Sequence, residues 1–141
     1  MQLRSGSRYQ NEMYSNITIR KNKIRRRYNG FRNTCQGYIG ELNDATCDIQ
    51  RIHLVYKLYS FIYDDKDNLL EYINMYESLV NFLQQVADDT PRFIRDIINI
   101  NRDPEISWSD MTGLTAMQDA YIFYELRQFL LMIIECHIEN H

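Results

Sequence analysis

Apolar residues recur at spacings of three and four along four stretches of the chain, which is the period of an amphipathic α-helix. The stretches cover residues 41–63, 68–87, 91–100 and 115–138. Their lengths and spacing predict an all-α fold in which four helices pack as a four-helix bundle-like body.

Three capping signatures predict where the later helices begin, because a side-chain oxygen before a helix satisfies its first free N–H groups. They are Asn68 with Glu71, Thr90 directly before Pro91, and Thr115 with Gln118. The segment 99–113 holds Pro104 and the single tryptophan, Trp108, and is predicted to be an acidic loop.

The fourth predicted helix is apolar over an arc of roughly 200°, about twice the width that a surface helix needs. Such a helix is either central in the bundle or shared between subunits. We expect a homo-oligomer, a homodimer in the first instance, with an interface formed by Ile122, Leu126, Phe129, Leu130 and Ile133. Arg127 lies within this arc and needs either a carboxylate partner or an exit to solvent.

Charge divides the chain near Thr34. Residues 1–34 hold nine basic residues and one acid, a net charge of +8, and the rest holds seven basic residues and 18 acids, a net charge of −11. No sustained helical period is evident before Thr34, glycines interrupt the segment and its like charges repel. We therefore expect a basic, largely disordered and flexible N-terminal arm, residues 1–34, attached to a helical domain, residues 35–141.

The arm contains a run of cations flanked by aromatic residues, which combines phosphate-neutralising charge with rings able to stack on bases. The candidate nucleic-acid-binding residues are Arg20, Lys21, Lys23, Arg25, Arg26, Arg27, Tyr28 and Arg32. A nuclear-import signal, an anionic membrane surface and the acidic body of the same protein are alternative targets of this charge.

No pattern in the chain predicts catalysis. There is no phosphate loop, no nucleophile elbow and no zinc-protease motif, so we expect a protein that is not an enzyme and that uses no cofactor. Three cysteines without CxxC spacing indicate a reducing, intracellular compartment. His137 and His141 have the spacing of a helical metal pair, but the pair is weakly specific and no metal site is predicted. No apolar run approaches the roughly 18 residues that span a bilayer, so no membrane association is expected.

The opening residues Leu3-Arg4-Ser5-Gly6-Ser7-Arg8-Tyr9 resemble the Arg-Ser-Gly-x-Arg/Lys-Tyr starts of many uncharacterised small proteins of large DNA viruses that infect amoebae. The resemblance implies a viral protein in the host cytoplasm or nucleus, engaged in replication or packaging, with the virion as a further location. It covers seven residues, and it assigns no fold and no functional residue.

These observations lead to two hypotheses. The first is a non-enzymatic nucleic-acid-associated protein whose basic arm binds DNA or RNA without reading its sequence. The second is an oligomeric scaffold or protein-interaction module whose arm docks on an acidic protein surface.

Overall fold

The computed structural model describes residues 2–102 and 107–140, with side chains from residue 16 onward. Over these residues all regular structure is helical, with six α-helices and one 3-10 turn, which confirms the predicted all-α fold. The chain forms two units, residues 1–34 and residues 35–141, and each is described by itself.

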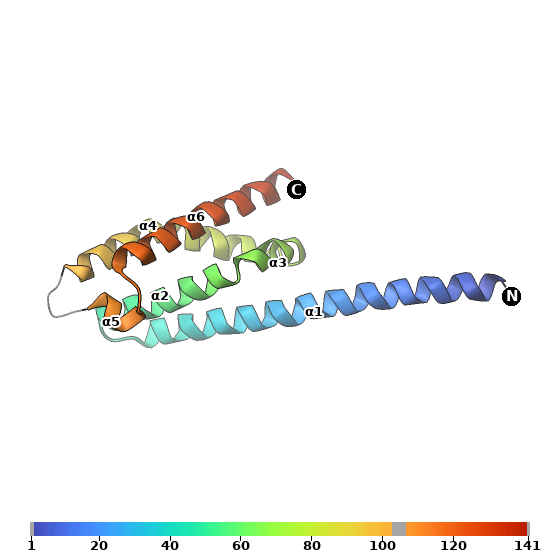
Figure 1. Cartoon of the computed structure of the whole chain (residues 1–141), viewed down its shortest axis with the longest axis horizontal. Helices are drawn as coiled ribbons and strands as arrows, with labels where there is room; N and C mark the ends of the chain where they lie inside the picture. The colour runs from blue at the N-terminus through green and yellow to red at the C-terminus, as the bar shows by residue number, and fades with distance from the viewer. Residues whose placement is uncertain (1, 103–106, 141) are drawn as a thin grey trace. The chain divides into compact units, whose positions relative to one another are not determined.

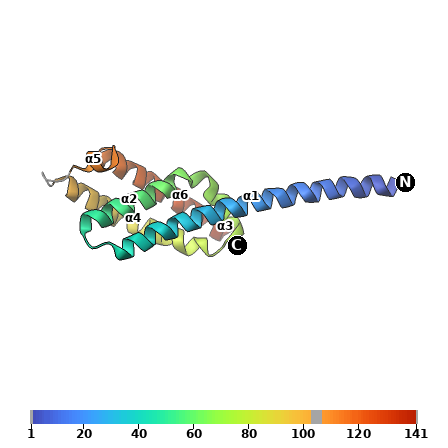
Figure 2. The same ribbon diagram turned by 90° about the horizontal axis from the view of Figure 1, so that it is seen from below.

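The first helix, α1 (Gln2–Asp44), includes the whole basic arm. Sequence analysis expected no regular structure there in isolation, whereas the structure describes residues 2–34 as the first part of a continuous helix (Figure 2). Arginine, lysine and glutamine have high helix propensity, and no proline interrupts residues 2–44. These preferences favour a helix despite the repulsion between like charges.

A periodic apolar stripe runs along α1 and was missed because the sequence was divided at Thr34. Its members follow at alternating spacings of four and three: Ile24, Tyr28, Phe31, Cys35, Tyr38 and Leu42. Tyr28, Phe31 and Cys35 are buried, and the other three are half-buried. This heptad-like repeat is the signature of one helix face, and it predicts the helix that the structure contains.

The helix predicted for residues 41–63 is wrong in its first part. The structure ends α1 at Asp44 and begins α2 (Asp48–Asp64) after a short connection whose last residue, Cys47, has extended backbone angles of −132° and 153°. The apolar spacing continues across the connection, so the pattern alone could not reveal the break.

The two helices predicted for residues 68–87 and 91–100 are also divided at the wrong place. After the turn η1 (Lys66–Asn68), the structure contains a short helix, α3 (Leu69–Met75), and a long one, α4 (Leu79–Asn101). Asn68 does not cap α3; its side-chain amide donates instead to Asp65 at 2.6 Å. The true break falls at residues 76–78, where Tyr76 leaves the helical conformation.

Thr90 and Pro91 lie inside α4 and do not start a helix. The Thr90 hydroxyl donates back to the Val86 carbonyl at 2.6 Å, as threonine does within a helix. Pro91 has no N–H and cannot bond to the Ala87 carbonyl, one turn earlier. Arg127 replaces the missing donor, because its Nε lies 3.1 Å from the Ala87 oxygen. This contact also supplies the partner that Arg127 was expected to need, and the partner is a carbonyl.

The last two helices are α5 (Trp108–Thr112) and α6 (Ala116–Glu139). The predicted capping box of α6 is confirmed: the Gln118 N–H donates to the Thr115 hydroxyl at 3.2 Å, and the Thr115 N–H donates to the Gln118 side chain at 2.9 Å. Trp108 was expected in a loop, but it opens α5 and is fully buried.

Within residues 35–141 the helix α6 packs most extensively against α4, and the two run in opposite directions (Figure 1). A cluster of aromatic rings joins α2, α4 and α6 at the centre. The ring centroids of Tyr59 and Phe93 are 5.2 Å apart, those of Phe93 and Phe123 4.9 Å, and those of Tyr59 and Phe123 5.4 Å. Edge-to-face and tilted contacts of this kind stabilise a core beyond the burial of apolar area.

Candidate functional site

The basic segment, residues 20–32, is a charged stretch of α1. The side chains of its arginines and lysines are all exposed. No aspartate or glutamate occurs from residue 13 to residue 40, so no acid along this part of the chain offsets the charge. Tyr28 differs from the other predicted binding residues, because it is 4% exposed and cannot stack on a base in this conformation.

Successive residues of an α-helix point about 100° apart, so neighbouring cations face different directions. Arg25, Arg26 and Arg27 therefore spread over more than half of the helix circumference. Arg32 adds a further contact, with its guanidinium carbon 5.8 Å from the centroid of the Tyr28 ring. Such a distribution suits a polyanion that contacts more than one side of the helix outside its buried stripe, as the two phosphate backbones of a groove do.

The predicted oligomer interface needs correction. Leu126, Leu130 and Ile133 are at most 1% exposed in a single chain, so they belong to the core and are not available to a second copy. Ile122 and Phe129 are half-buried. The wide apolar arc of the fourth helix therefore reflects its central position, the first of the two readings that the sequence left open.

The exposed face of α6 carries a different set of large side chains, here called the α6 stripe. Its members recur at spacings of four, three and eight residues, which keeps them on one side of the helix. They are Met117, Tyr121, Tyr124 and Met132, with exposures of 83%, 63%, 55% and 50%. Sequence analysis assigned none of them a role.

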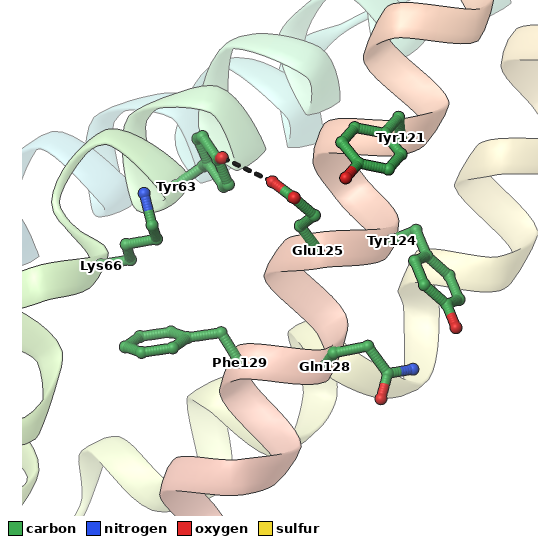
Figure 3. Close-up of a pocket in the computed structure, with 7 residues that line it drawn as sticks. All are labelled: Tyr63, Lys66, Tyr121, Tyr124, Glu125, Gln128 and Phe129. Carbon is green, nitrogen blue, oxygen red and sulfur yellow. Dashed lines mark hydrogen bonds between the residues drawn. The ribbon is translucent and has the colours of Figure 1, made fainter.

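A pocket of about 460 Å³ opens beside this stripe (Figure 3). Tyr63 at the end of α2 and Lys66 in η1 form one wall. The opposite wall is a single stretch of α6 and consists of Tyr121, Tyr124, Glu125, Gln128 and Phe129. The pocket thus combines four aromatic rings, one carboxylate and one ammonium group.

Glu125 is the polar centre of the pocket. The Tyr63 hydroxyl donates to its Oε2 at 2.8 Å, as Figure 3 shows. Hydrogen bonding by Tyr63, followed by hydrogen bonding by Tyr121 and the charge of Lys66, lowers the pKa of Glu125 below its usual range. The same hydrogen bond and the negative charge raise the pKa of Tyr63. At neutral pH the pocket therefore holds an ionised carboxylate between two neutral hydroxyls.

Lys66 lies against the same wall, with its Nζ 4.0 Å from the centroid of the Tyr63 ring. This distance is within the range of a cation–π interaction, in which the negative face of the ring attracts a cation. The pocket is therefore negative at its carboxylate and ring faces, with one cation on its edge.

Sequence analysis missed this pocket because its two walls are far apart in the chain. Tyr63 and Glu125 are separated by 62 residues. The available signal was the close spacing of Tyr121, Tyr124 and Glu125 on one predicted helix, which does not identify the residues opposite.

A second polar cluster lies in the core. Asp119 is fully buried, and its Oδ2 accepts hydrogen bonds from Trp108 Nε1 and, at 3.5 Å, from the Thr112 hydroxyl. Burial raises the pKa of the Asp119 carboxyl. The cluster ties α5 to the first turn of α6, so we assign it a structural role.

Over the described residues no three His, Cys, Asp or Glu side chains are placed to hold a metal ion. The helical pair of His137 and His141 includes His141, which lies outside the described residues. None of the helices in the described ranges combines the length and the apolar character needed to cross a membrane.

No protein-family model, curated protein or solved structure matches the chain.

Proposed function

We propose that this chain is a non-enzymatic nucleic-acid-associated protein that uses the basic segment of α1 to bind phosphates without reading base sequence. The observation that supports this proposal is a 13-residue helical segment with seven exposed cations and no acid. Such a helix is a strong local source of positive potential in a chain whose total charge is −3. The role agrees with the setting that the N-terminal resemblance implies, viral replication or packaging inside a host cell.

Salt dependence gives the proposal a magnitude. Each phosphate of duplex DNA that is neutralised adds about −0.9 to the slope of log affinity against log salt concentration. If all seven cations contact phosphates, the slope reaches roughly −6. A helix that binds through fewer cations gives a proportionally smaller slope.

The test compares two variants of the full chain with equal net charge. In the first, Lys21, Lys23, Arg25 and Arg26 are changed to Gln. In the matched control, four exposed cations of the body are changed to Gln: Lys57, Arg92, Arg95 and Arg102. Affinity for a fluorescent 20-mer duplex is measured by anisotropy between low and moderate salt concentrations.

We expect the first variant to lose more than tenfold in affinity at low salt and to reduce the slope by about 3 to 4, because four phosphate contacts are lost. The control should keep its slope. Equal losses in both variants would mean that net charge alone governs binding, and an unchanged slope in the first variant would refute the role of the basic segment.

The second candidate is an oligomeric interaction module whose arm docks on an acidic protein surface. The α6 stripe favours this function, because exposed methionine and tyrosine are typical of protein interfaces. Its test is the molar mass in light scattering of Met117→Glu and Met132→Glu, with Leu70→Glu on α3 as an exposed apolar control. A dimeric wild type that becomes monomeric only in the α6 variants supports the module, and a monomeric wild type at all concentrations excludes self-association through this face.

A further inference from the structure

We infer that the pocket between α2, η1 and α6 binds an organic ammonium cation, with methylated ammonium as the best-fitting class. The inference rests on the walls of the pocket, its carboxylate and the position of Lys66. It is independent of nucleic-acid binding by α1, since no residue of the basic segment takes part.

The walls provide faces for a cation. Tyr63 and Tyr121 lie on two sides of the carboxylate of Glu125, and Phe129 lines the pocket one turn further along α6 (Figure 3). The face of an aromatic ring is negative, and several rings around one point form the cage that recognises methylated ammonium groups. A volume of about 460 Å³ lies within the range of small-molecule sites.

The carboxylate determines the charge of the ligand that the pocket favours. Glu125 is half-buried and is kept ionised by its hydroxyl donors, so the pocket carries a fixed negative charge at neutral pH. An anionic ligand would meet this charge at close range. A cation would be attracted by the rings and by the carboxylate together.

The hydrogen bonds of Glu125 favour ammonium over guanidinium. Tyr63 already donates to Oε2, and the Tyr121 hydroxyl also lowers the pKa of this carboxylate. A guanidinium binds a carboxylate best through two parallel hydrogen bonds, which need lone pairs on both oxygens. A quaternary ammonium has no N–H donor and needs only the ring faces and the charge.

Lys66 occupies part of the site in this structure and acts as an internal competitor. Its ammonium group lies on the face of Tyr63 at 4.0 Å, the position that an incoming cation would take. Binding of an external cation therefore requires Lys66 to leave that face, which its long and partly exposed side chain allows. Removal of Lys66 should consequently strengthen cation binding, whereas it would weaken binding of an anion.

The experiment uses two probes of nearly the same shape, choline and its uncharged carbon isostere 3,3-dimethylbutan-1-ol. The full chain is labelled with ¹⁵N and titrated with each probe at neutral pH, and chemical-shift changes are followed. A third titration with ethylguanidinium tests the choice of ammonium. An open pocket with exposed rings should bind choline weakly, with a dissociation constant on the order of 1–10 mM.

Two variants and one control make the test specific. Glu125→Gln keeps the shape and an acceptor for the tyrosine hydroxyls but removes the charge, and it should weaken choline binding about fivefold. Lys66→Gln should strengthen it by about two- to fivefold. Glu135→Gln, at an exposed position ten residues later on α6, removes one charge outside the pocket and should leave binding unchanged.

The proposal is supported if choline shifts the pocket resonances, the isostere does not, and the two variants change affinity in opposite directions. Equal binding of the isostere would show an apolar site without cation selectivity. Weaker choline binding by Lys66→Gln, tighter binding of ethylguanidinium than of choline, or no shift in either wild type or Lys66→Gln would each overturn it.

Discussion

The contact between Arg127 and the Ala87 carbonyl gives the sharpest test of how α4 accommodates a proline. Ala87 is fully buried, and the residue that would normally donate to its carbonyl is Pro91. If Arg127 supplies the missing hydrogen bond, replacement of Arg127 should cost more when residue 91 is proline than when it is alanine.

The size of the effect follows from the type of bond. Hydrogen bonds with a charged partner contribute about 1.5–3 kcal/mol, and half-burial of Arg127 places this one near the lower end. We expect Arg127→Met to lower the free energy of unfolding by about 1.5 kcal/mol in the Pro91 background. In the Pro91→Ala background the restored N–H can bond to the Ala87 carbonyl, so the cost should fall to about 0.5 kcal/mol and the coupling energy should be about 1 kcal/mol.

The four proteins of this cycle are compared by urea denaturation, followed by circular dichroism and by the fluorescence of Trp108, with unchanged m-values as the condition for comparison. Arg95→Met, an exposed arginine of α4, removes the same charge and should change stability by less than about 0.5 kcal/mol. A coupling energy below about 0.3 kcal/mol would refute the reasoning, because it would mean that Arg127 and Pro91 act independently.

Three further predictions concern the core and the surface. Because burial raises the folded-state pKa of Asp119, its contribution to stability is full below the unfolded pKa of about 3.9 and is lost as pH rises through the higher folded value. Asp119→Asn should therefore gain stability relative to wild type between pH 4 and pH 7, measured as the difference in urea midpoints; no change with pH would contradict this. Cys47 and Cys136 are exposed and should react with a thiol reagent in the folded protein. Cys35 is buried and its pKa is raised to about 12, so it should react only after unfolding. Rapid reaction of all three cysteines in the folded protein would contradict this prediction. Gly113 ends α5 with a φ of 76°, so Gly113→Ala should lower the free energy of unfolding by about 1 kcal/mol in the same denaturation assay, and an unchanged midpoint would rule out that conformation.

The sequence predicted the helical class and the capping box of α6 because both depend on residues close together in the chain. Thr115 and Gln118 satisfy each other across one turn, so nothing distant is needed to form this signature. The pair Thr90 and Pro91 gives an equally strong local signal, yet it lies within a helix. The difference is Arg127, which is 40 residues from Ala87 and compensates the broken bond from another helix.

The same limit explains what was missed in α1 and in the pocket. The stripe from Ile24 to Leu42 was visible as a period, but dividing the chain by charge at Thr34 cut it in two. The pocket could not be predicted from any short stretch of sequence, because the partner of Glu125 is Tyr63 on α2, 62 residues away in the chain. A change in net charge along the chain and the end of a helix are independent features. The change of charge at Thr34 therefore does not mark the end of a helix.

Three tyrosine hydroxyls show why the pocket, and not the other polar contacts of the body, is the candidate for binding. Tyr59 is buried and its hydroxyl donates to the Val86 carbonyl at 3.3 Å, and Tyr72 is buried and donates to Asp65 at 3.1 Å. In both cases the core covers the ring, so the hydroxyl satisfies a structural partner and the ring face is not available to a ligand. Tyr63 donates to Glu125 in the same way, but its ring remains half-exposed and holds only a lysine that can leave. An ionised carboxylate next to solvent-exposed ring faces can attract a cation from solution. The solvent exposure of the tyrosine ring therefore distinguishes this binding site from the core contacts of Tyr59 and Tyr72.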